Sequence, residues 1–183
     1  ALLALQGPMA ATVLARHAAD CTGLAFMSAA AMTVGGIDCV VSRSGYTGED
    51  GFEISLAGDR AEALARLLLA EPEVAPIGLG ARDSLRLEAG LCLHGHDIDA
   101  TTTPIEAGLR WTIAKRRQSD GGFPGAAVIQ RQLAEGALRR RVGLRPEGRA
   151  PAREGTEVTD SAGAIIGAVT SGGYGPSFGG PVA

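Results

Sequence analysis

The stretch that decides the fold is residues 37–56, IDCVVSRSGYTGEDGFEISL, in which two β-rich segments flank a reversal punctuated by glycine. Ile37–Arg43 and Phe52–Leu56 have the composition of strands, and the Gly, Thr and Asp residues between them are typical of a hairpin with a longer loop. Because strands joined by a hairpin pair antiparallel, the stretch predicts an α+β fold rather than a series of βαβ crossovers.

Helical patterns occur on both sides of this hairpin. Proline is harmless at the first position of a helix, since its missing N–H would have no partner there, and Asp59 with Glu62 resembles a capping box. A loop as long as Gly95–Gly108 is often functional in compact domains. We expect helices at Pro8–Ala19, from Asp59 onward, at Gly80–Ala89 and at Pro124–Leu133, and a further strand at Trp111–Ala114.

The character of the chain changes after Gly136. Short β-rich segments separated by Gly, Pro and Ser follow, at Arg141–Arg145, Glu157–Thr159 and Ala164–Ser171. We therefore expect two parts: an α+β region with antiparallel sheets and packed helices over residues 1–136, and an all-β module that begins near Ala137 and runs through residues 137–183.

Composition and charge exclude several classes of protein. Hydrophobic residues make up 45% and charged residues 20%, which is typical of a globular chain. The net charge of −3 argues against a nucleic-acid partner. No apolar run approaches the roughly 20 residues that span a bilayer, so we expect no membrane segment, and Ala1–Pro8 lacks the features of a signal peptide. Cys21, Cys39 and Cys92 form no CxxC pair, which favours a reducing compartment over a disulfide framework or a thiolate zinc site.

Glu53 is the first candidate for a functional side chain. Because successive side chains of a strand alternate between faces, Phe52, Ile54 and Leu56 share an apolar face and Glu53 lies on the other one. The structural interpretation is a carboxylate on the solvent side of a half-buried sheet. The functional interpretation is a ligand for a group with two adjacent N–H donors, since the two carboxylate oxygens match such an edge. The residues alone leave both interpretations open.

Arg82 is the second candidate. In the predicted helix Gly80–Ala89 it lies in the same half as Leu85 and Arg86. An arginine so close to an apolar surface either extends its charge to solvent or reaches a buried anion, and the free N–H groups of a first helical turn favour an anion. Neutralisation by the neighbouring Asp83 is the alternative.

The run His94-Gly95-His96-Asp97 could supply metal ligands, but no further His or Cys cluster completes a coordination shell. We expect no metal here and a loop held by side-chain hydrogen bonds instead. The glycine pairs of the chain match neither a P-loop nor a dinucleotide-binding motif, and a nucleophile elbow is missing as well.

Several blocks of the chain resemble one family. Ser44–Ile54 is similar to the GYTGEDGxEI signature of the aminomethyltransferases of the glycine cleavage system (T-proteins), and Gly80–Leu91 resembles their ARDSLRLEAGL block. Further similar blocks follow in order at Leu93–Ile98, Thr103–Leu109, Trp111–Thr112, Arg140–Leu144 and Gly167–Gly172. A likeness that runs almost from end to end is far more specific than one short motif.

The resemblance implies a function. T-proteins take an aminomethyl group from the lipoyl arm of the H-protein, release ammonia and pass the one-carbon unit to tetrahydrofolate. By this resemblance Glu53 matches the family's folate-binding glutamate and Arg82 its folate-binding arginine, and Tyr46 is expected to stack or hydrogen-bond near the pterin. Tetrahydrofolate would be the co-substrate and the lipoylated H-protein the partner, and residues 137–183 would begin a C-terminal barrel-like domain.

The resemblance also places part of the site outside these residues. The family's catalytic aspartate belongs to a segment before Leu2–Pro8, and a further folate-contacting arginine lies beyond Ala183, so we expect no catalytic residue among residues 1–183. Preorganised groups lose much of their value when water enters a site. We therefore expect negligible transferase activity from these residues alone.

Two related functions and one unrelated function remain as alternatives. One is the folate-binding domain of a dimethylglycine- or sarcosine-oxidising flavoprotein. Another is a non-catalytic folate-binding relative involved in iron–sulfur cluster maintenance, whose KGCYxGQE-type segment has no counterpart here. The third is a plain interaction module. The Ala- and Gly-rich composition favours a bacterial gene and hence the cytoplasm, with the mitochondrial matrix as the expected place of a eukaryotic protein.

Overall fold

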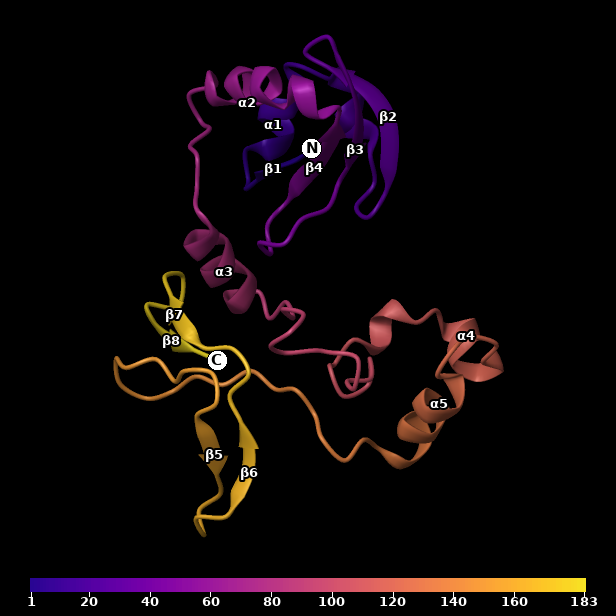
Figure 1. Ribbon diagram of the computed structural model, residues 1–183, viewed down its shortest axis with the longest axis vertical. Coiled ribbons are helices and arrows are strands. Elements are labelled where there is room, and N and C mark those ends of the chain that lie inside the picture. Colours follow the sequence, from indigo (N-terminus) through magenta and orange to yellow (C-terminus); the bar gives the residue numbers. More distant parts are fainter. The chain divides into compact units, whose positions relative to one another are not determined.

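The hairpin predicted at residues 37–56 is present, and it forms the centre of a four-stranded antiparallel sheet. The structure is a computed structural model that describes residues 1–183 and divides into two units, Ala1–Ala89 and Gly90–Ala183. The sheet belongs to the first unit and has the strand order β1-β4-β3-β2 (Figure 1). Its strands are β1 (Leu2–Gln6), β2 (Ala29–Val34), β3 (Ile37–Ser42) and β4 (Gly51–Leu56).

The alternation expected in β4 is confirmed. Phe52 and Ile54 are fully buried and Leu56 is nearly so, whereas Glu53 is half-buried and Ser55 is exposed. Because β4 is an inner strand, Glu53 has a neighbour on each side, Ala4 in β1 and Ser42 in β3. The sheet therefore fixes the backbone of Glu53 on both sides.

Two helices cover the apolar face of this sheet. They are α1 (Ala10–Ala15) and α2 (Ala61–Leu69), and α3 (Leu79–Glu88) follows after an extended segment (Figure 1). Val13 and Leu14 of α1 and Leu64 of α2 are completely buried in one core with the strand residues. Short 3-10 helices, η1 (Ala19–Gly23) and η2 (Gly58–Arg60), complete the unit.

Two details of the predicted helices are wrong. The helix expected at Pro8–Ala19 is limited to α1, because the amide of Ala10 closes a turn on the carbonyl of Gly7 and the backbone of Ala18 (φ −154°, ψ 84°) is not helical. No capping box forms before α2 either, since the 3-10 turn η2 precedes it and no side chain caps it. The third helix, by contrast, ends before Gly90 as expected, and Gly90 has the positive φ of 69° that favours glycine.

The second unit contains short helices and two small hairpins. The helical elements are η3 (Arg110–Thr112), α4 (Lys115–Asp120) and α5 (Ala126–Glu135). The hairpins pair β5 (Glu157–Thr159) with β6 (Ile165–Ala168), and β7 (Gly173–Gly175) with β8 (Gly180–Val182). The α+β prediction is confirmed for the chain, and these two hairpins do not close a barrel.

Three expectations for the second unit need correction. Trp111 lies in the 3-10 helix η3 and not in a strand. The last predicted helix begins two residues later than expected, at Ala126, because the left-handed backbone of Gly125 (φ 81°) cannot continue it backward to Pro124. Arg141–Arg145 forms no regular strand, although Leu144 exchanges two backbone hydrogen bonds with Ala183.

Candidate functional site

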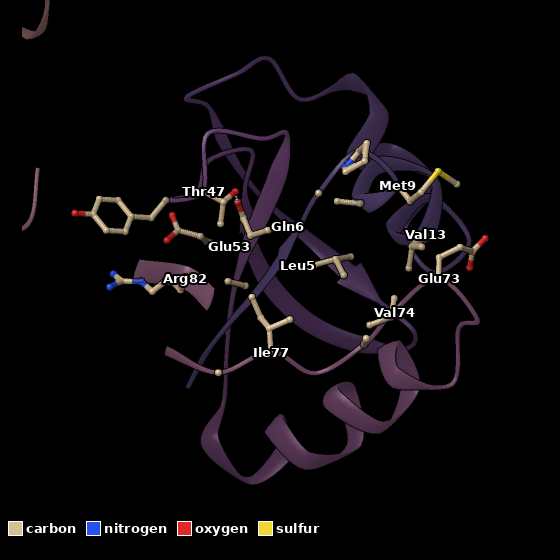
Figure 2. Close-up of a pocket in the computed structure, with 18 of the residues that line it drawn as sticks. Leu5, Gln6, Met9, Val13, Thr47, Glu53, Glu73, Val74, Ile77 and Arg82 are labelled. Atoms are coloured by element: carbon tan, nitrogen blue, oxygen red, sulfur yellow. Dashed lines mark hydrogen bonds between the residues drawn. The ribbon is translucent and has the colours of Figure 1, made fainter. Parts of the chain in front are cut away.

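A cavity of about 880 Å³ opens on the first unit and collects residues from distant parts of the sequence (Figure 2). Its walls come from β1, the start of α1, the loop before β4, the segment after α2 and the first turn of α3. All three residues predicted to bind the substrate, Tyr46, Glu53 and Arg82, line it. The fold therefore brings the candidates together in one place.

Glu53 is held in a defined orientation by serine hydroxyls. The hydroxyl of Ser44 donates a hydrogen bond of 2.6 Å to Oε2 of Glu53, and the hydroxyls of Ser42 and Ser44 lie 2.8 Å apart. A charged acceptor makes this type of hydrogen bond short and strong. One carboxylate oxygen of Glu53 is thus engaged by the protein.

Tyr46 and Arg82 form the second feature of the site. The guanidinium carbon of Arg82 lies 4.4 Å from the centroid of the Tyr46 ring, which is a cation–π contact. Asp83, the neighbour considered as a neutralising partner, bonds instead to Arg86, with 2.7 Å from Nε of Arg86 to Oδ1. Arg86 is the buried arginine of α3, with 3% of its surface exposed, and the sequence did not single it out.

The loop between β3 and β4 is closed at its base by an ion pair between its first and last residues. Nε and Nη2 of Arg43 donate to the two carboxylate oxygens of Asp50 at 2.9 and 2.7 Å. These hydrogen bonds lower the pKa of Asp50 and raise that of Arg43. The carbonyl of Asp50 also accepts the amide of Gly7 at 2.8 Å, so the loop is tied to the end of β1 as well.

The opposite end of the cavity is apolar. Figure 2 shows Met9, Val13 and Val74 there, whereas Glu53, Thr47 and Arg82 lie at the other end. Glu73 lies at the rim of the apolar end, where its carboxylate bonds to Arg16 at 2.6 and 2.9 Å. Hydrogen bonds from Arg16 lower the pKa of Glu73 to about 2.

Sequence reasoning missed three polar residues at the site. Gln6 and Thr47 line the cavity, and Ser44 orients Glu53. Thr47 and Ser44 belong to the quoted loop, but Gln6 is the last residue of a strand that the sequence did not single out. The sequence offers one signal for Gln6: it is a polar residue at the end of an apolar strand, directly before Gly7 and Pro8.

The loop that contains His94, His96 and Asp97 is held by hydrogen bonds of its side chains. Asp97 accepts from the amide of Leu93 at 2.8 Å and from the hydroxyl of Thr170 at 2.6 Å. Nδ1 of His96 lies 2.8 Å from the carboxylate of Glu154. No group of three or more His, Cys, Asp or Glu side chains is arranged to hold a metal ion in residues 1–183.

None of the three cysteines forms a disulfide. Cys21 and Cys39 are buried in the core of the first unit, and burial raises the pKa of both thiols. A buried thiol with a raised pKa stays protonated and is a poor nucleophile. No helix of the chain has the length and apolar character needed to cross a membrane.

The sequence matches two known protein-family models. Residues 1–117 match the GCVT N-terminal domain, and residues 139–183 match the glycine cleavage T-protein C-terminal barrel domain. The first match covers the whole first unit with all residues that line the cavity, and the second covers both hairpins of the second unit. The sequence thus combines two domains that define one class of protein.

Curated relatives and a solved structure agree with these matches. The chain is 52% identical to the mitochondrial aminomethyltransferase of Dictyostelium discoideum over 96% of its own length and 46% of the relative's. It is 56% identical to that of Canis lupus familiaris, over 94% and 43%. The crystal structure of glycine cleavage system aminomethyltransferase T from Bartonella henselae matches with a TM-score of 0.90 at 52% identity, covering 100% of this chain and 50% of that one.

The chain therefore belongs to the aminomethyltransferase (glycine cleavage T-protein) family. The predicted fold is confirmed too, as a mixed α+β structure followed by the beginning of the C-terminal barrel domain. The named relatives do not favour the alternative of a folate-binding domain from an oxidising flavoprotein. The chain spans slightly less than half the length of the curated relatives it matches.

Proposed function

We propose that the complete protein carrying this chain is an aminomethyltransferase of glycine cleavage. It would take the aminomethyl group from the lipoyl arm of the H-protein, release ammonia and transfer the one-carbon unit to tetrahydrofolate. Membership in the aminomethyltransferase family supports this activity. The single observation that supports the folate site is that Glu53, Tyr46 and Arg82 line one cavity.

The chemistry of these three residues fits a reduced folate. A pterin presents adjacent N–H donors in a guanidine-like edge, and a carboxylate such as Glu53 can accept both. The hydroxyl of Ser44 orients that carboxylate from behind at 2.6 Å. Tyr46 offers an aromatic face, and Arg82 offers a positive charge for a carboxylate of the glutamyl tail. The apolar end of the cavity would take an uncharged part of the ligand.

We also propose that the domain boundary lies near Ala137, as the change of composition suggests. The two family matches end at residue 117 and begin again at residue 139, which supports a junction between them. The lipoylated H-protein would be the partner, and neither nucleic acid nor a membrane would bind. A bacterial source would place the protein in the cytoplasm. The eukaryotic relatives are named mitochondrial.

The activity can be tested with the complete polypeptide. Wild-type protein is incubated with aminomethyl-lipoyl H-protein and tetrahydrofolate, and release of ammonia is measured. We expect turnover that depends on both substrates and falls by on the order of a hundredfold or more in Glu53→Ala, since the charge that holds the pterin is lost. Glu62→Ala removes an exposed carboxylate of α2 and is the matched control.

Two results would argue against this function. Release of ammonia at an equal rate without tetrahydrofolate would show that the reaction does not use the folate. Oxidation of sarcosine or dimethylglycine together with no activity on the H-protein would favour the flavoprotein alternative instead.

A further inference from the structure

The side-chain amide of Gln6 crosses the loop that carries Tyr46. Its Nε2 donates to the carbonyl of Ser44 at 3.1 Å and to that of Phe52 at 3.3 Å, and its Oε1 accepts the hydroxyl of Thr47 at 3.2 Å. An amide offers two N–H donors and one oxygen, so both polar atoms of the Gln6 side chain are used, by the loop and by Phe52 at the start of β4. The two carbonyl acceptors also define which end of the amide is the nitrogen.

The amide packs directly against two glycines, Gly45 in the loop and Gly51 at the start of β4. A Cβ atom added at Gly45 would lie 1.8 Å from Oε1 of Gln6, and one added at Gly51 would lie 2.5 Å from its Cδ and Nε2. Neither position leaves room for even one methyl group while the amide stays in place. Glycine at both positions therefore lets the Gln6 side chain enter the loop from β1.

Gln6 thereby fixes the neighbours of the two ligand-facing residues. Thr47, which follows Tyr46, is 7% exposed and bonds to Gln6. Ser44, which bonds to the carboxylate of Glu53 through its hydroxyl, is held through its carbonyl. Figure 2 shows Gln6 beside Thr47, between the polar end of the cavity and Leu5.

We propose that Gln6 is a positioning residue for ligand binding, which acts by holding Ser44–Thr47 so that Tyr46 faces the cavity. This inference rests on the proposed folate site. It assigns to Gln6 an effect on affinity that passes through Tyr46 and not through direct contact with the ligand.

The test is a double-mutant cycle on the affinity of the complete polypeptide for formyltetrahydrofolate, a reduced folate that resists oxidation. Gln6→Met keeps the length of the side chain and removes all three hydrogen bonds. We expect it to weaken binding about tenfold in the wild-type background, because the loop loses its restraint. In the Tyr46→Ala background we expect less than about a twofold further loss, since the residue that Gln6 positions is already gone.

A matched control is available in the second unit. Nε2 of Gln130 also donates to two backbone carbonyls, those of Gln118 and Ser119 at 3.2 and 2.8 Å. We expect Gln130→Met to leave the affinity for formyltetrahydrofolate unchanged. Gly45→Ala is a second variant in case Gln6→Met folds poorly. Its new methyl group displaces the Gln6 amide, so it should weaken binding by a similar factor.

The outcomes separate this inference from the proposed function. If Glu53→Gln weakens binding but Gln6→Met and Gly45→Ala do not, the role assigned to Gln6 is wrong. An equal loss from Gln6→Met in the wild-type and Tyr46→Ala backgrounds also overturns it, because Gln6 would then act independently of Tyr46. If Glu53→Gln and Arg82→Ala both leave affinity unchanged, the folate site itself fails.

Discussion

The guanidinium carbon of Arg82 lies 4.4 Å from the centre of the Tyr46 ring, and this contact joins α3 to the loop before β4. Stacking of this kind uses the flat face of a guanidinium and leaves its N–H edge for a carboxylate. The loop and the helix therefore form one surface of the cavity together, to which the loop contributes the aromatic ring of Tyr46 and α3 contributes the positive charge of Arg82. Glu53 lies at the same end of the cavity (Figure 2).

Because Glu53 and Arg82 share one end of the cavity, their roles toward a folate need separate tests. If Arg82 binds the glutamyl tail, Arg82→Ala weakens tetrahydrofolate binding by about tenfold or more and leaves tetrahydropterin, which has no tail, unaffected. Arg66→Ala removes an exposed arginine of α2 and should change neither affinity. Equal losses for both ligands would show that Arg82 acts on the pterin instead. The measurement is a calorimetric titration of the complete polypeptide.

Gly48 is required for a steric reason as well as a conformational one. Its φ is 81°, and an added Cβ would lie 2.6 Å from Cβ of Ala89. Gly36 has a similar φ of 79° but open space around it, so Gly36→Ala isolates the conformational cost of about 1 kcal/mol. We expect Gly48→Ala to lower the free energy of unfolding by roughly 1–3 kcal/mol more than that. Urea denaturation measures both, and equal values would show that the contact with Ala89 has no energetic weight.

The ion pair between Arg16 and Glu73 predicts a pH dependence of stability. The pKa of Glu73 is lowered from the ordinary 4.5 to about 2, so the folded chain holds this proton less tightly than the unfolded chain. The stabilisation is therefore complete above pH 4.5 and is lost as the pH falls toward about 2. Glu73→Gln should remove this part of the acid loss, whereas Glu62→Gln should retain it. Identical acid unfolding profiles for wild type and Glu73→Gln would contradict the prediction.

The sequence was sufficient to predict the parts of the fold that depend on local pattern. The alternation of Phe52, Glu53 and Ile54 places the two apolar residues in the core and the carboxylate on the other face, as the structure has it. The position of Gly90 likewise predicts the end of α3. Both features follow from spacing and backbone conformation within a few residues.

Features that depend on distant partners were not predictable. Trp111 has the bulk of a strand residue. It lies in a 3-10 helix instead, where the amide of Thr112 donates to the carbonyl of Leu109. Asp59 and Glu62 match a capping box in sequence, but the 3-10 turn before α2 already satisfies the backbone. In the sequence, β2 and β3 lie between Gln6 and Thr47. Their contact is therefore visible only once β1 is known to pair with β4.

The most direct test of the account is the affinity of Glu53→Gln for tetrahydrofolate, measured by calorimetry on the complete polypeptide. Glutamine keeps the shape of the side chain but loses its charge and one acceptor, so we predict binding weaker by on the order of tenfold to a hundredfold. Glu62→Gln should bind like the wild type. An affinity of Glu53→Gln equal to that of the wild type would contradict the account.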